Sequence, residues 1–214
     1  MKPAIFNTDM VRAILDGRKT QTRRIMKPQP EKFAWGLSWD NQKKGKKFFG
    51  WASTDIDDFK SLVVNHAPYK KGDIIYVRET FNDEGWEDQQ RLIYKADVIQ
   101  DKDFNTYWWK PSIHMPKEYA RLFLRVKDVR IERLNEISYE DALSEGIERD
   151  FDNGNEWHLY KDYSTVRFEF EYDFCPQRSF GSLWESIYGK DSFNDDYVWV
   201  IEFDKISKEE AING

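Results

Sequence analysis

The stretch GRKTQTRR, residues 17–24, places hydroxyl, amine and guanidinium groups directly after a predicted helix. If the chain is extended after the turn, Thr20, Thr22 and Arg24 share one face, because side chains alternate along a strand. Lys19, in the turn, could fold toward Thr22. A threonine hydroxyl becomes a nucleophile when a neighbouring base removes its proton, and burial can lower a lysine pKa enough for that role. A guanidinium binds phosphate or carbonyl oxygens. An ordinary solvated loop fits the same residues.

Three helices are predicted around this stretch. The first runs from Thr8 to Asp16, with Asn7 or Thr8 as its cap and Gly17 where a helix commonly ends. The second lies in ISYEDALSEGI, with Ser138 as its cap and Gly146 as its stop. The third is SFGSLWESIYG, whose apolar stripe, including Trp184, has the spacing of a core-facing surface.

Strands are predicted at residues 71–81, 91–98, 121–134 and 197–203, with a break near Asp128 that fits a bulge or a turn. Strand runs interrupted by short helices favour an α+β fold built on a small mixed β-barrel rather than a sandwich. We expect one domain over residues 1–214, with insertions at about 31–66 and 149–177, where no clear periodicity occurs.

Composition limits the classes of function. The net charge of -6 and the pI of 5.3 argue against a uniformly basic surface for duplex DNA, but the first fifty residues carry a net positive charge. A local anion site on an acidic protein is therefore expected. A single cysteine, Cys175, and three scattered histidines give no metal-ligand spacing, so neither a metal nor another cofactor is expected. No apolar run approaches the roughly 20 residues of a membrane helix, which predicts a cytoplasmic protein without membrane contact.

Further candidates for substrate contacts lie elsewhere in the chain. In KPSIHMP, two prolines favour an extended loop in which Ser112 and His114 point to the same side. Tyr76, Trp108 and Trp109 are candidate stacking surfaces for a nucleobase. A structural role is the more common explanation for each of these residues.

The stretch at residues 14–24, ILDGRKTQTRR, resembles the signature of the ASCH domain, a PUA-like β-barrel family with the pattern G-x-K-x-x-E-x-R after its first helix. Gly17, Lys19 and Arg24 match that pattern, whereas Thr22 stands where the family usually has glutamate. The departure is similar to one branch, the N4-acetylcytidine amidohydrolases, which have K-T-x-T-x-R. The segments GDIIYVRETF and ISYEDALSEGI also resemble ASCH segments, and most of the chain is similar to the longer ASCH-like proteins of phages and prophages, although their usual NPWVW is DDYVW here.

The resemblance implies a catalytic set of Lys19, Thr22 and a glutamate. Glu145 is the best candidate for the glutamate, because it occupies the last turn of a predicted helix, where the helix dipole disfavours a carboxylate by roughly 0.3–1 kcal/mol. Glu140 and Glu148 are the nearby alternatives.

Four functions remain open at this point. The first is binding of a nucleobase, nucleoside or single-stranded nucleic acid, with hydrolysis of N4-acylated cytidine by the Lys19, Thr22 and Glu145 set. The second is a non-catalytic reader of RNA or modified bases. The third is a ribonuclease, and the fourth is a phage assembly or host-interaction protein. Arg24, Thr20, Tyr76, Ser112, His114 and Trp109 are the expected substrate contacts, whereas Arg18 and Arg23 are expected to be solvated.

Overall fold

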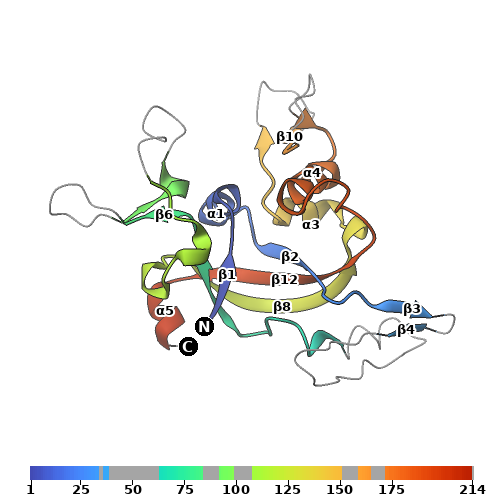
Figure 1. Ribbon diagram of the computed structural model, residues 1–214, viewed down its shortest axis with the longest axis horizontal. Coiled ribbons are helices and arrows are strands. Elements are labelled where there is room, and N and C mark those ends of the chain that lie inside the picture. Colours follow the sequence, from blue (N-terminus) through green and yellow to red (C-terminus); the bar gives the residue numbers. More distant parts are fainter. Residues whose placement is uncertain are drawn as a thin grey trace.

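The computed structural model describes residues 1–33, 36–38, 63–83, 92–98, 108–150, 159–164 and 172–213. The chain forms short helices and strands in mixed order (Figure 1). The strands are β1 (Lys2–Ile5), β2 (Gln21–Ile25), β3 (Glu31–Phe33), β4 (Gly36–Ser38), β5 (Ile74–Arg78), β6 (Phe81–Asn82), β7 (Ile93–Tyr94), β8 (Phe123–Arg133), β9 (Arg149–Asp150), β10 (Leu159–Lys161), β11 (Tyr172–Asp173) and β12 (Tyr197–Ile206). The α-helices are α1 (Thr8–Leu15), α3 (Tyr139–Ser144), α4 (Pro176–Tyr188) and α5 (Lys208–Asn213), and the 3-10 helices are η1 (Lys95–Asp97), η3 (Ser112–His114), η4 (Lys117–Tyr119) and η5 (Leu134–Glu136).

A five-stranded mixed sheet forms the centre of the molecule, in the order β1-β5-β8-β12-β2. β1 pairs with β5 in parallel, and the other neighbours are antiparallel. The predicted α+β class is therefore confirmed as a mixed sheet with short helices. The two edge strands approach each other through one side chain, because Arg24 in β2 donates from Nη2 to the Ile5 carbonyl oxygen in β1 at 2.8 Å.

The longest predicted strand, over residues 121–134, is β8, and its partner is β12. The register shifts between Glu202 and Phe203 of β12, which face Asp128 and Val126 of β8. The break predicted near Asp128 is therefore a bulge within one strand and not a turn between two.

The predicted strand over residues 91–98 is wrong beyond its first part. β7 covers only Ile93–Tyr94, and η1 follows at once. The side chain of Arg12 in α1 donates to the carbonyl oxygens of Ala96 and Val98, at 2.9 and 2.8 Å. These contacts satisfy carbonyl groups that a neighbouring strand would otherwise bond.

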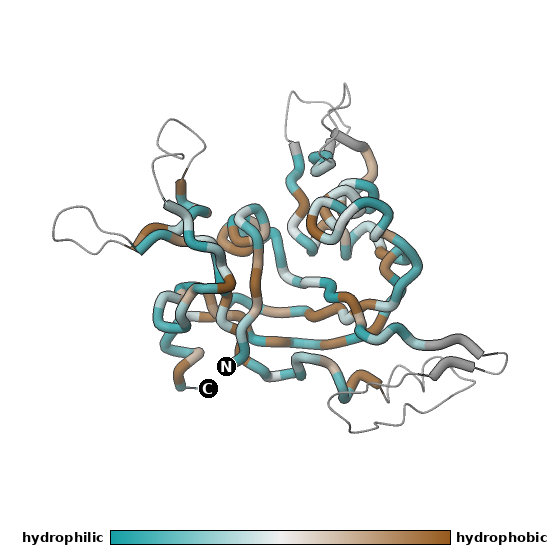
Figure 2. The backbone as a smooth tube through the Cα atoms, in the orientation of Figure 1, coloured by the Kyte–Doolittle hydropathy of each residue, from teal (hydrophilic) through white to brown (hydrophobic). Residues whose placement is uncertain are grey.

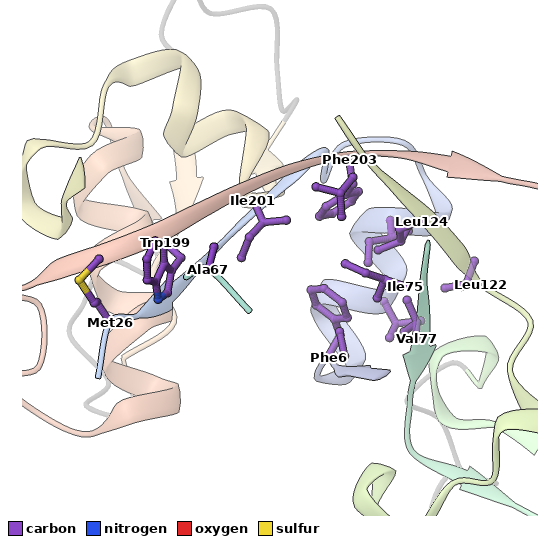
Figure 3. Close-up of a cluster of buried hydrophobic side chains, with 14 of the residues drawn as sticks. Phe6, Met26, Ala67, Ile75, Val77, Leu122, Leu124, Trp199, Ile201 and Phe203 are labelled. Atoms are coloured by element: carbon purple, nitrogen blue, oxygen red, sulfur yellow. The ribbon is translucent and has the colours of Figure 1, made fainter. Parts of the chain in front are cut away.

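Two cores pack on opposite faces of β12, since alternate residues of a strand point to opposite sides. Trp199, Ile201 and Phe203 point to one side, where they meet Phe6 and side chains of β5 and β8 (Figure 3). Val198 and Val200 point to the other side, against α4. Central strands and α1 accordingly carry many of the hydrophobic segments in Figure 2.

The helix ends follow their predicted signals. Asn7 caps α1, since its side chain accepts from the Met10 amide at 2.8 Å, and Ser138 caps α3 by accepting from the Asp141 amide at 3.1 Å. Gly17 and Gly146 follow these helices with positive φ angles of 77° and 84°.

The predicted insertions are described only in part. In the first, β3 and β4 form a hairpin, while residues 34–35 and 39–62 lie outside the described part. In the second, β9, β10 and β11 form a three-stranded sheet, while residues 151–158 and 165–171 lie outside it. None of the described helices is long and apolar enough to cross a membrane.

Candidate functional site

A pocket of about 300 Å³ lies at the edge of the sheet. α1 and α4 stand on either side of β2 (Figure 1), and residues of all three elements line the pocket. One wall comes from the end of β1 and the start of α1: Ile5, Phe6, Asn7, Thr8 and Met10. The opposite wall comes from α4: Phe180, Leu183, Trp184, Ile187 and Tyr188. The remaining lining residues are all polar or charged: Thr22, Arg23 and Arg24 of β2, with Thr80, Ser112 and Glu145.

Lys19 and Glu145 form a buried ion pair beside this pocket. Lys19 Nζ donates to Glu145 Oε2 and to the Glu145 backbone oxygen, both at 2.8 Å. The exposed fractions of the two side chains are 0% and 2%. Of the three glutamates considered, Glu145 is therefore the one that contacts Lys19.

Burial lowers the pKa of Lys19 below its ordinary value of 10.5, because the charged ammonium loses its hydration. The ion pair with Glu145 opposes this shift, whereas the nearby charges of Arg24 and Arg23 add to it. A lysine with a lowered pKa releases its proton more readily, which is a property that a general base requires.

Backbone contacts hold Glu145 next to Lys19. The peptide groups of Lys19 and Glu145 form an isolated antiparallel bridge, and the Thr20 amide donates to the Ser144 carbonyl oxygen at 2.9 Å. A Cβ on Gly146 would lie 2.6 Å from Lys19 Cβ. Glycine at 146 thus permits the close approach that brings Glu145 to Lys19.

Arg23 is not solvated as expected, because its side chain is completely buried. It donates to Glu145 Oε1 at 3.1 Å, to Asp141 Oδ2 at 2.7 Å and to Glu132 Oε2 at 2.8 Å. Burial alone would lower the pKa of Arg23, but Glu145 and the other carboxylates raise it, so the guanidinium stays charged. Arg18 is also held, by a bond from Nη1 to the Gly146 carbonyl oxygen at 2.8 Å.

The alternation of β2 explains why neighbouring residues serve different parts of the site. Thr22 pairs with Ile201 and Arg23 with Val200 of β12, so the two side chains leave the strand on opposite faces. Thr22 is 3% exposed and lines the pocket. Within the part of the chain that the structure describes, its hydroxyl makes no hydrogen bond, whereas Lys19 bonds to Glu145.

Arg24 holds its guanidinium against the wall formed by the end of β1 and the start of α1. The group lies over the Phe6 ring, 5.1 Å from the ring centroid, and donates to the Ile5 carbonyl oxygen. It lines the pocket together with Thr22, two residues before it in β2. Arg24 therefore lies where it can contact a ligand in the pocket, as predicted for a substrate contact.

The other predicted contacts divide into two groups. Ser112 lines the pocket from η3. Thr20 and His114 are exposed, Tyr76 packs in the separate cluster around Ile74, and Trp109 is half-buried. None of these four lines the pocket.

Sequence reasoning missed the contributions of Arg23, Phe6 and the α4 wall. Trp184 was expected in the core, and it is indeed buried, but it also lines the pocket. The spacing of the apolar residues in α4 predicts which of them face the protein interior. It does not predict that part of this face lines a pocket. Arg23 and Arg24 are neighbours, so in an extended chain their side chains should point to opposite faces. This was the signal in the sequence that the two guanidinium groups have different surroundings.

Comparisons of the chain with protein-family models, curated proteins and solved structures found no match. Among the described residues, no group of three or more His, Cys, Asp or Glu side chains is placed to hold a metal ion. The chemical interpretation of the site therefore depends on its own geometry.

Proposed function

We propose that the pocket binds a cytosine nucleoside and that the protein hydrolyses the amide bond of an N4-acylated cytidine. The observation that carries this proposal is that Thr22 and Glu145 line one pocket, while Glu145 holds the buried Lys19 and the Thr22 hydroxyl bonds to no other described residue. A hydroxyl, a lysine with a lowered pKa and a carboxylate are the groups that amide hydrolysis through an acyl-enzyme requires.

In the proposed reaction, Lys19 in its neutral form leaves the Glu145 carboxylate and accepts the proton of the Thr22 hydroxyl. The Thr22 oxygen attacks the acyl carbonyl carbon, and a tetrahedral intermediate forms. The bond from that carbon to N4 then breaks, and the Lys19 ammonium returns the proton to N4. Water, deprotonated by Lys19, hydrolyses the threonine ester and releases the carboxylic acid. Free cytidine and the acid are the products, and the Thr22 hydroxyl and Lys19 are restored.

Glu145 acts on Lys19 in this scheme and does not receive the Thr22 proton. Both of its carboxylate oxygens accept hydrogen bonds, one from Lys19 and one from Arg23. It stabilises the ammonium that Lys19 becomes after each proton transfer.

The proposal also includes the fold: we propose that the chain forms a PUA-like ASCH barrel. The residues that resemble the ASCH pattern, Gly17, Lys19 and Arg24, lie around the pocket or in the turn before β2. The sheet edges β1 and β2 are bridged by the Arg24 side chain, at the position where a barrel would close.

The test is the release of cytidine from N4-acetylcytidine by the wild type, Lys19→Met and Thr22→Val. Thr20→Val is the matched control, because Thr20 has the same side chain two residues before Thr22 but is exposed and lies outside the pocket. We expect turnover by the wild type and by Thr20→Val only. Equal rates in all four proteins would remove the mechanism.

A second candidate is a non-catalytic reader of a nucleobase in the same pocket. The observation in its favour is that Lys19 and Arg23 both pair with Glu145, which is also the arrangement of a structural ion-pair network. Binding of cytidine or N4-acetylcytidine without release of cytidine would select this function.

A further inference from the structure

Arg24 is the charged residue of the pocket that lacks a carboxylate partner. The described residues that line the pocket include three charged ones, Arg23, Arg24 and Glu145. Arg23 and Glu145 are bonded to each other and to further charged groups. Within the described residues, Arg24 forms no ion pair, and its side-chain hydrogen bond uses one nitrogen, Nη2. The remaining N–H groups of its guanidinium are therefore available to an anion.

The start of α1 lies next to this guanidinium. Arg24 bonds to Ile5 and covers Phe6, and Asn7 and Thr8 follow directly in the pocket wall. The first amides of a helix have no acceptor in a preceding turn and carry a partial positive charge. The Asn7 side chain caps the Met10 amide, which leaves the amides at the very start of α1 to a ligand. Asp9 is exposed, lies 3.9 Å from Arg12 and does not line the pocket.

Thr22 gives independent evidence that a polar ligand atom belongs in this pocket. Its side chain is buried, yet within the described residues its hydroxyl has no hydrogen-bond partner. Because Thr22 lines the pocket, this hydroxyl can donate to or accept from a polar atom of a ligand. Consecutive side chains on one face of a strand start about 7 Å apart, so one small molecule can contact both Thr22 and Arg24.

We propose that Arg24 and the start of α1 bind the phosphate group of a nucleoside monophosphate whose base lies against α4. This inference rests on the proposed function for the base and sugar, but the phosphate subsite can be tested without it. The α4 wall offers the Trp184 and Tyr188 rings, with centroids 4.4 Å apart, as the apolar surface for a base. A volume of about 300 Å³ is at the lower end of ligand pockets, which suits one nucleotide rather than a strand.

The experiment measures dissociation constants by calorimetry for two matched pairs of ligands, cytidine 5′-monophosphate with cytidine and ribose 5-phosphate with ribose. The proteins are the wild type, Arg24→Gln and Arg133→Gln. Arg133 is the matched control, because it also lies over an aromatic ring, Tyr197, and bonds to a backbone oxygen, that of Asp195, but it does not line the pocket. An oligocytidine is the fifth ligand.

We expect the phosphorylated member of each pair to bind at least about tenfold more tightly to the wild type and to Arg133→Gln. Arg24→Gln should abolish that preference. Equal binding of both members to the wild type, or a preference that survives Arg24→Gln, would overturn the subsite. Tighter binding of the oligocytidine would overturn the choice of a mononucleotide. A preference for ribose 5-phosphate without any hydrolysis of N4-acetylcytidine would support the subsite while the proposed function failed.

Arg24 also bridges two strands, so its replacement could disturb folding. Thr8→Pro provides a second test, since proline is well tolerated at the first position of a helix and removes only an amide donor and a hydroxyl. Thr8→Val keeps the amide and removes the hydroxyl. We expect Thr8→Pro to weaken phosphate binding by several-fold relative to Thr8→Val. Identical affinities of the two variants would contradict a role for the α1 amide.

Discussion

Lys19 and Glu145 are joined twice, by a hydrogen bond between their side chains and by a second bond from Lys19 Nζ to the Glu145 backbone oxygen, both 2.8 Å long. The second bond ties the lysine to the end of α3 even when the carboxylate loses its charge. The pair is thus held by the backbone as well as by Coulomb attraction.

Removal of Glu145 should destabilise the protein more than removal of Lys19. Glu145→Gln leaves two buried cations, Lys19 and Arg23, without this carboxylate, whereas Lys19→Met leaves Glu145 paired with Arg23. Breaking a buried pair costs about 3–5 kcal/mol, and we expect Glu145→Gln to fall in this range and Lys19→Met below it. Urea denaturation of the two variants measures the difference. A larger loss of stability in Lys19→Met than in Glu145→Gln would show that Lys19, and not Arg23, is the main counterion of Glu145.

Gly146→Ala should destabilise the protein more than Gly72→Ala. Both glycines have positive φ angles, of 84° and 87°, so both substitutions carry the strain of the left-handed region, about 1–2 kcal/mol. Only at Gly146 would the new Cβ approach other atoms, at 2.6 Å from Lys19 Cβ and 2.7 Å from Ala13 Cβ. Thermal unfolding of both variants tests this. Equal shifts in Tm would mean that the contact between Lys19 and Gly146 is looser than described.

Arg23→Gln should reduce turnover of N4-acetylcytidine through Glu145 and Lys19. The substitution frees Glu145 Oε1 and removes a positive charge that lowers the pKa of Lys19, so that pKa should rise. Arg130→Gln is the control, because Arg130 contacts Asp141 and Glu132, as Arg23 does, but not Glu145. The pH profile of kcat should move to higher pH in Arg23→Gln and stay in place in Arg130→Gln. A profile unchanged in both would assign Arg23 a purely structural role.

The rate of hydrolysis should rise with pH up to a plateau. Lys19 must be neutral to accept a proton, and its pKa lies below 10.5, so the neutral fraction increases as the pH passes the lowered value. The same shift affects stability. Between the folded pKa and 10.5 the unfolded chain binds more protons than the folded chain, so this group favours folding increasingly as the pH rises. Initial rates of hydrolysis over the whole pH range in which the protein stays folded measure the pH dependence of turnover. A rate that falls over that range would contradict Lys19 as the base.

Local signals in the sequence were sufficient for the elements around the site. Residue type and spacing predicted a cap at Asn7 or Thr8, a cap at Ser138 and a break near Asp128, although only the structure shows that the break is a bulge. The contact of Lys19 with Glu145 was expected only through a family resemblance, because 126 residues separate them. No local pattern encodes such a separation.

The burial of Arg23 shows most clearly what the sequence left open. An arginine beside another arginine has the pattern of a solvated strand edge, and burial is favourable here only because Glu132, Asp141 and Glu145 come from two other elements. The strand predicted over 91–98 failed for a related reason, since a tertiary contact from Arg12 supplies the hydrogen bonds that decide its backbone.

The most direct test of the central claim is mass spectrometry of the protein during turnover of N4-acetylcytidine, by rapid quench and peptide mapping, beside the rate of cytidine release. If Thr22 is the nucleophile, a transient acetyl group appears on the peptide that contains Thr22, and Thr22→Val shows neither the adduct nor cytidine release. Cytidine release that persists at the wild-type rate in Thr22→Val, with no acetylated peptide at any quench time, would contradict it.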